Sequence, residues 1–137
     1  MKGHRILVVD DDPDFQELIA DILIRNGYEP IPALGGIEGI DILAADPGIS
    51  LLILDVMMPD LDGYEVCKKI KESDSTALPI IFLTAKAQPE DVRRAYAVGG
   101  DDYIVKPFEI TQLIEAIEKA LDDRPGRRPR SPMKGVM

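Results

Sequence analysis

Short apolar runs alternate along this chain with segments in which apolar residues recur every three or four positions. The short runs predict buried strands at 6–9, 51–54, 80–83 and 103–105. A weaker run at 28–33 contains two prolines, and proline removes a hydrogen-bond donor from a sheet. We therefore expect that strand at an edge of the sheet.

The intervening segments have the spacing of amphipathic helices. Phe15, Leu18 and Ile19 begin an apolar face with the steps of three and four residues typical of one helix side. Asp12 precedes this helix as a predicted N-cap, and Gly27 follows it as a predicted stop. Four more helices are expected: one with Ile37, Ile40 and Ala44 on its packed side, one after Gly63 that ends near Glu72, one at 89–98, and one at 110–121.

Strand and helix thus alternate five times. Apolar strands separated by helices indicate a parallel sheet covered on both faces, and right-handed crossovers limit its topology. The predicted fold class is therefore α/β, a (βα)5 three-layer sandwich, with one domain over residues 1–123. Residues 124–137 contain three prolines, two glycines and five basic residues without an apolar period, which predicts a disordered tail or a linker.

Charge is distributed unevenly between this body and the tail. Because all 25 acidic residues and only 11 of the 16 basic residues precede Arg124, the body carries a net charge of −14 and the tail +5. An acidic body argues against direct nucleic-acid binding by this domain but suits a bound cation. The single cysteine, Cys67, fits a cytoplasmic protein, and no apolar stretch is long enough to span a membrane.

Polar residues follow four of the predicted strands. Asp10 and Asp11 come after the first strand, and Asp55 comes after the third. Thr84 ends the fourth strand, and Lys106 follows the fifth. Because ligands bind at the carboxyl ends of the strands in open α/β sheets, we expect three carboxylates, a hydroxyl and an ammonium group to meet at one edge.

This set of groups suits phosphoryl transfer to an aspartate. Crowded carboxylates favour a bound cation, and an incomplete shell of oxygen ligands suits Mg2+. An aspartate such as Asp55 can attack phosphorus and form an acyl phosphate. Mg2+, Lys106 and the Thr84 hydroxyl could each bind one equatorial oxygen of the transferred group, and the small Ala85 would leave room for it.

Four segments of the sequence closely resemble the receiver domain of two-component response regulators, and the resemblance covers residues 5–122. They are ILVVDDDP at 6–13, LILDVMMPDLDG at 52–63, FLTA at 82–85 and DDYIVKPF at 101–108. The resemblance implies a flavodoxin-like fold with a five-stranded parallel sheet in the order 2-1-3-4-5. It also implies phosphorelay signal transduction, with a histidine kinase or phosphotransfer protein as donor and a downstream output domain or effector.

The same resemblance assigns roles at the acidic edge. It implies that Asp55 is the phosphoacceptor and that Asp11 and Asp55 bind Mg2+ (or Mn2+) directly. Asp10 would bind the ion mainly through water, and the backbone carbonyl of Met57 would be a further ligand. Such a domain contributes to its own phosphorylation and dephosphorylation without being an enzyme.

The resemblance also assigns the residues around the phosphoryl group. Lys106 would contact that group, and the bond between Lys106 and Pro107 would be cis. Thr84 and Tyr103 match the switch pair of the family, in which Thr84 moves toward the phosphoryl oxygens and Tyr103 fills the vacated space.

Three other functions fit the sequence less well. An aspartyl-phosphate phosphohydrolase usually needs a second carboxylate two residues after the nucleophile, where this chain has Met57. A silent receiver-like binding module conflicts with the complete set of acids, hydroxyl and lysine, and a nucleotide-binding protein conflicts with the missing glycine-rich loop. A homodimer through the fourth and fifth helices, and a longer protein whose linker begins near Arg124, both stay open.

Overall fold

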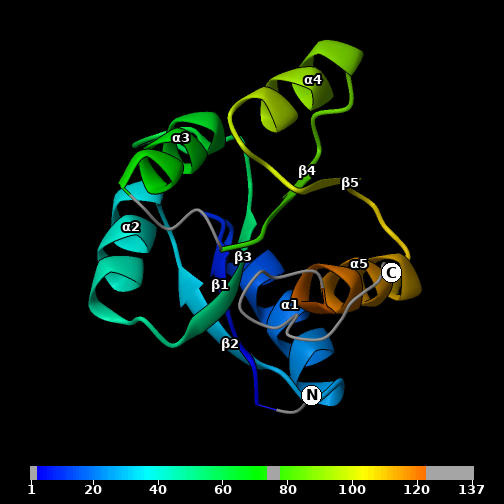
Figure 1. Cartoon of the computed structure of the whole chain (residues 1–137). Helices are drawn as coiled ribbons and strands as arrows, with labels where there is room; N and C mark the ends of the chain where they lie inside the picture. Colours follow the sequence, from blue (N-terminus) through cyan, green and yellow to red (C-terminus); the bar gives the residue numbers. More distant parts are fainter. Residues whose placement is uncertain (1–2, 74–77, 123–137) are drawn as a thin grey trace, which may run out of the picture.

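The computed structural model describes residues 3–73 and 78–122, in which strands and helices alternate (Figure 1). The strands are β1 (Arg5–Val9), β2 (Glu29–Ala33), β3 (Ile49–Leu54), β4 (Ile80–Thr84) and β5 (Asp102–Val105). The helices are α1 (Pro13–Arg25), α2 (Gly36–Ala45), α3 (Gly63–Ser73), α4 (Pro89–Ala97) and α5 (Ile110–Asp122). None of these helices is long and apolar enough to cross a membrane.

The five strands form one parallel sheet in the order β2-β1-β3-β4-β5. This order confirms the predicted (βα)5 flavodoxin-like fold. The proline-containing strand β2 lies at one edge, as predicted, where a missing N–H donor is tolerated. Both β1 and β3 therefore lie inside the sheet, and their carboxyl ends are neighbours.

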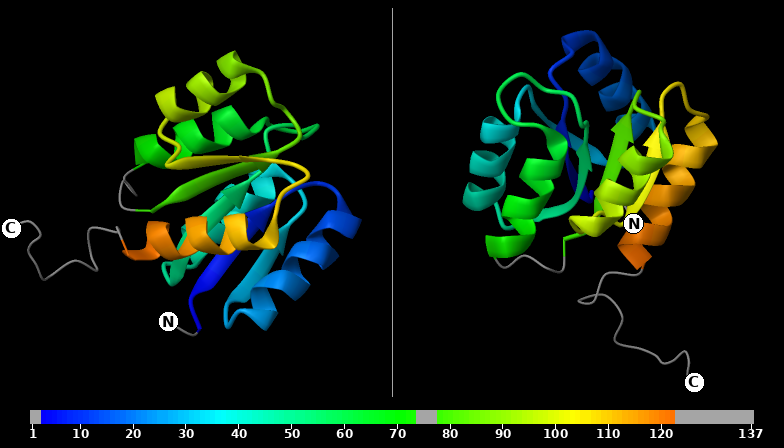
Figure 2. Two further views of the ribbon diagram at one scale, coloured as in Figure 1. Left: turned by 90° about the vertical axis from the view of Figure 1, so that its right-hand side faces the viewer. Right: turned by 90° about the horizontal axis from the view of Figure 1, so that it is seen from above.

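Helices cover both faces of the sheet. α1 and α5 lie on one face, and α2, α3 and α4 lie on the other (Figures 1 and 2). Successive side chains of a strand point to opposite faces, so Leu52 and Leu54 pack toward α2, α3 and α4. Leu51 and Ile53 pack toward α1 and α5. Every central strand is thus apolar on both sides, which explains the continuous apolar runs.

Two helix faces differ from the sequence prediction. In α1, Asp12 caps the helix as predicted, but Leu18 is 53% exposed because the packed face follows Gln16, Ile19 and Leu23. The prediction for Leu18 was wrong because it lies about 100° around the helix from Ile19.

In α2 the predicted packed side was also wrong in part. Ile40 packs against the core, but Ile37 is 54% exposed and Ala44 is exposed. The buried residues are Gly36 and Gly39, and an added Cβ at Gly39 would lie 2.6 Å from a methyl group of Val9. Since glycine brings the helix backbone close to β1, the glycine side faces the sheet.

Candidate functional site

The carboxyl ends of β1, β3 and β5 bring charged groups from distant parts of the chain together. One carboxylate oxygen from each of Asp10, Asp11 and Asp55 lies within 4.8 Å of the other two. The ammonium nitrogen of Lys106 lies 2.8 Å from Oδ2 of Asp10 and 4.0 Å from Oδ2 of Asp55. The predicted meeting of three carboxylates and one ammonium group is therefore present in the structure.

The burial of these groups makes the site electrostatically unfavourable for two anions. Asp10 and Asp55 are only 2% and 8% exposed, whereas Asp11 is exposed to solvent. Burial raises the pKa of Asp55, and the nearby charge of Asp10 raises it further. A hydrogen bond from Thr84 and the charge of Lys106 act in the opposite direction but do not outweigh burial. A hard cation beside these oxygens would relieve both penalties, so the donor set fits Mg2+.

Backbone N–H groups orient the two buried carboxylates. Oδ1 of Asp55 accepts a hydrogen bond from the N–H of Val56 at 2.8 Å, and Oδ1 of Asp10 accepts one from the N–H of Asp12 at 2.9 Å. In each case one oxygen is held by the backbone. Oδ2 of Asp10 faces Lys106, and Oδ2 of Asp55 lies at the limit of its reach.

Gln16 also supports this edge, a role that was not predicted from the sequence. Its side-chain amide nitrogen lies 2.9 Å from the carbonyl oxygen of Val8, 3.0 Å from that of Asp10 and 2.9 Å from that of Ala33. The amide therefore ties α1 to the ends of β1 and β2. The available signal was its position three residues before Ile19, which puts a polar residue on the buried helix face.

Thr84 and Tyr103 lie on neighbouring strands near Asp55. Thr84 is fully buried, and the next residue, Ala85, is exposed. The Tyr103 hydroxyl donates a hydrogen bond of 3.0 Å to the carbonyl of Lys86, and burial raises its pKa. Its ring also stacks on Phe82 with the ring centroids 6.0 Å apart. Tyr103 therefore contacts the loop that follows Thr84.

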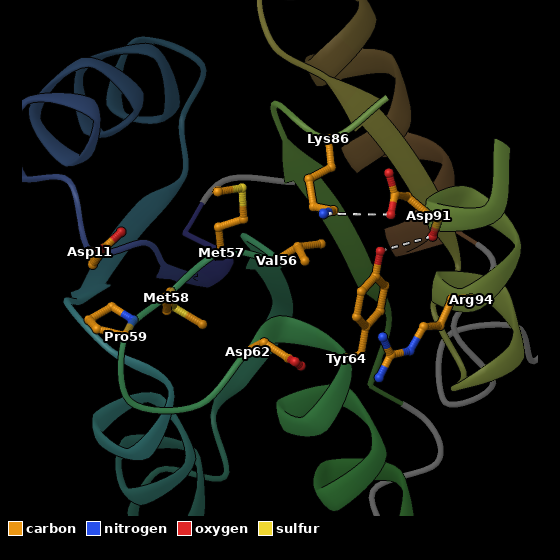
Figure 3. A pocket seen from close by; sticks show the side chains of 10 residues that line it. All are labelled: Asp11, Val56, Met57, Met58, Pro59, Asp62, Tyr64, Lys86, Asp91 and Arg94. Carbon is orange, nitrogen blue, oxygen red and sulfur yellow. Dashed lines mark hydrogen bonds and ion pairs between the residues drawn. The ribbon is translucent and has the colours of Figure 1, made fainter. Parts of the chain in front are cut away.

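A groove of about 490 Å³ opens beside the acidic edge (Figure 3). Its lining includes Asp11 and Met57 on one side and Lys86, Tyr64 and Asp91 on the other. Lys86 forms an ion pair of 3.8 Å with Asp91, and Tyr64 donates a hydrogen bond to the carbonyl of Asp91. Met57 lines this groove and is 59% exposed to solvent.

The bond between Lys106 and Pro107 is cis, as the resemblance implied. Residues 6–118 match the family model described as "Response regulator receiver domain". The chain belongs to this family. As a receiver domain, it is a phosphoacceptor of two-component signalling and not a conventional enzyme. The phosphohydrolase alternative is therefore set aside.

Relatives of this receiver domain are regulators about twice its length. RpaA of Synechocystis sp., named a DNA-binding dual master transcriptional regulator, is 36% identical over 128 residues, which cover 93% of this chain and 52% of RpaA. Response regulator MprA of Mycobacterium avium is 41% identical over 117 residues, which cover 85% of this chain and 50% of MprA. The chain thus spans about half the length of the curated relatives it matches.

A solved relative has the same fold. The response regulator protein TrrA of Thermotoga maritima, in complex with Mg(2+)-BeF, is 36% identical with a TM-score of 0.78. The match covers 88% of this chain and all of the TrrA chain. The similarity therefore extends over the whole layered body of the receiver domain.

Proposed function

We propose that Asp55 is the residue of this receiver domain that becomes phosphorylated, in a step that depends on Mg2+ (or Mn2+). The observation that carries the proposal is the convergence of Asp55 with Asp10, Asp11 and Lys106 at one sheet edge. The Mg(2+)-BeF complex of TrrA supports the choice of ion. Asp11 and Asp55 would hold the ion directly, with the Met57 backbone carbonyl, and Asp10 would act mainly through water.

The transfer follows from the placement of these groups. An oxygen of Asp55 attacks the phosphorus of a phosphohistidine donor, and the new P–O bond forms as the P–N bond breaks, with the electron pair left on the donor nitrogen. Bound Mg2+ would neutralise negative charge on the transferred group. Lys106 and the hydroxyl of Thr84 would each bind another phosphoryl oxygen, and the small, exposed Ala85 leaves space for the group.

Phosphorylation would change the surface through Thr84 and Tyr103. The new group adds about −1.5 to −2 charges and three acceptor oxygens beside Thr84. A shift of Thr84 toward them would alter the 84–86 loop, and the hydroxyl of Tyr103 already binds the carbonyl of Lys86 in that loop. The surface formed by α4, β5 and α5 would then differ between the two states.

A receiver domain implies a histidine kinase as its partner, and we propose that a histidine kinase or a histidine phosphotransfer protein is the direct donor. RpaA is named a DNA-binding regulator, and this chain matches only about half of the length of RpaA. We therefore also propose that an output domain or effector reads the switched surface. A homodimer through α4 and α5 stays a prediction. The domain boundary at 123 and the basic tail at 124–137 lie outside the described residues and also stay predictions.

We expect the proposed metal site to lose affinity for Mg2+ when the Asp11 carboxylate is removed. We expect Asp11→Ala to bind Mg2+ at least about tenfold more weakly, because one direct carboxylate ligand is removed. Titration calorimetry measures the affinity. Glu17→Ala is the matched control, since Glu17 is an exposed acid of the same region outside the acidic edge. Equal affinities of Asp11→Ala and Glu17→Ala would contradict the proposed ligand set.

The raised pKa of Asp55 predicts a pH-dependent cost to stability without Mg2+. A carboxyl group whose pKa is raised by folding holds its proton more tightly in the folded state, so its effect on stability becomes less favourable as pH rises. Without Mg2+, we expect Asp55→Asn to match the wild type near pH 3 and to have the higher free energy of unfolding at pH 7. Urea denaturation at both pH values tests this. A less stable Asp55→Asn at pH 7 would contradict it.

A further inference from the structure

The ring of Phe15, at the start of α1, lies against the ammonium group of Lys106. The Lys106 nitrogen is 3.8 Å from the ring centroid, well within the range of a cation–π interaction. The same nitrogen donates to Asp10 at 2.8 Å and faces Asp55 at 4.0 Å. Two carboxylates and one aromatic face therefore surround this ammonium group. The Lys106 side chain as a whole is only 22% exposed.

A second contact holds the ring in place. Phe108, two residues after Lys106, packs against Phe15 in an edge arrangement with centroids 6.3 Å apart and planes at 78°. Both rings are partly buried against the core on the α1 and α5 face. Phe15 thus contacts the β5–α5 loop at two points, and its orientation toward Lys106 does not depend on the lysine alone.

We propose that Phe15 is a positioning residue for phosphoryl transfer, acting through Lys106. A lysine side chain has a flexible four-carbon stem and three rotatable donors. The aromatic face attracts the charge and excludes water from one side, so the remaining N–H donors are directed toward Asp10, Asp55 and the space where phosphoryl oxygens arrive. The proposal rests on the proposed role of Lys106 in binding the phosphoryl group.

Fluorination of the Phe15 ring distinguishes a cation–π role from simple packing. Stepwise fluorination of the Phe15 ring weakens its negative face with little change in size, so a residue that only fills the core would tolerate it. The rate of phosphorylation by acetyl phosphate at saturating Mg2+ is the measurement. We expect the rate to fall stepwise with each added fluorine, by about two- to tenfold over the series.

Two natural substitutions complete the test of Phe15. Phe15→Tyr keeps an aromatic face and should stay within about twofold of the wild-type rate, whereas Phe15→Leu should be at least as slow as the most fluorinated ring. Lys106 contacts Asp10 of the proposed metal site, so all rates are compared at saturating Mg2+, where a change in Mg2+ affinity does not affect the comparison. A phosphorylation rate that does not fall as fluorine is added would overturn the proposal.

Lys106→Ala separates failure of this inference from failure of the proposed function. If Lys106→Ala is slow and the fluorinated series has the wild-type rate, the role of Phe15 is overturned and that of Lys106 stands. If Lys106→Ala has the wild-type rate, both roles are overturned. A slow Lys106→Ala together with a stepwise decline in the fluorinated series supports both.

Discussion

Asp55→Asn is expected to take up no measurable phosphoryl group from acetyl phosphate in the presence of Mg2+, at least about 100-fold less than the wild type. The amide is a poor nucleophile toward phosphorus and cannot form the acyl phosphate. It has nearly the shape of the carboxylate, so its oxygen can still accept the N–H of Val56. Incorporation of radiolabelled phosphate, or an electrophoretic shift, measures the difference.

Asp62→Asn is the matched control for this experiment. Asp62 lies on the same β3–α3 loop and lines the groove, but it is not one of the three converging acids. Its carboxylate accepts the N–H of Glu65 at 2.9 Å, and an asparagine can keep that bond. The control should be phosphorylated like the wild type. Full labelling of Asp55→Asn would refute Asp55 as the phosphoacceptor.

Gly63→Ala is expected to destabilise the fold by about 2–4 kcal/mol in the free energy of unfolding. A Cβ at Gly63 would lie 2.2 Å from the carbonyl oxygen of Asp55 and 2.9 Å from the Cα of Val56. Both are backbone atoms, so relief requires moving either α3 or the phosphoacceptor segment. Chemical denaturation measures the loss.

Gly48→Ala is the control for Gly63→Ala. The nearest atom to a Cβ there is a carboxylate oxygen of Asp46 at 3.2 Å, on a side chain. We expect a change within about 1 kcal/mol, since that side chain can shift slightly. If the two variants were equally stable, the tight contact between the start of α3 and Asp55 would not be present in solution.

Much of the site was predictable because the carboxyl ends of parallel strands lie along one edge of the sheet. Asp10, Asp55 and Lys106 each directly follow an apolar run, and parallel strands end on the same side. The order of the strands came from the resemblance to the receiver family, and the structure confirms it. The local pattern also identified Asp12 as a helix cap, since capping depends on neighbours in the chain.

Helix faces were less predictable, because periodicity counts apolar residues and does not weigh how closely a helix approaches the sheet. Ile37 was predicted to lie on the packed face of its helix, yet it is half exposed. Gly36 and Gly39 turned out to lie on the packed side, where a side chain would collide with Val9 or Val66. A glycine in a helix carries no apolar signal, so the close approach was visible only in three dimensions.

Local patterns along the chain thus specify the alternating strands and helices, the acidic edge and the chemistry that such an edge can perform. They depend on neighbours in sequence and on the common direction of parallel strands. Only the folded molecule specifies that Phe15 covers Lys106 and that Gln16 joins three carbonyls. Phe15 and Lys106 are 91 positions apart in the numbering, and such a contact arises from the packing of α1 beside the β5–α5 loop, which no local pattern encodes.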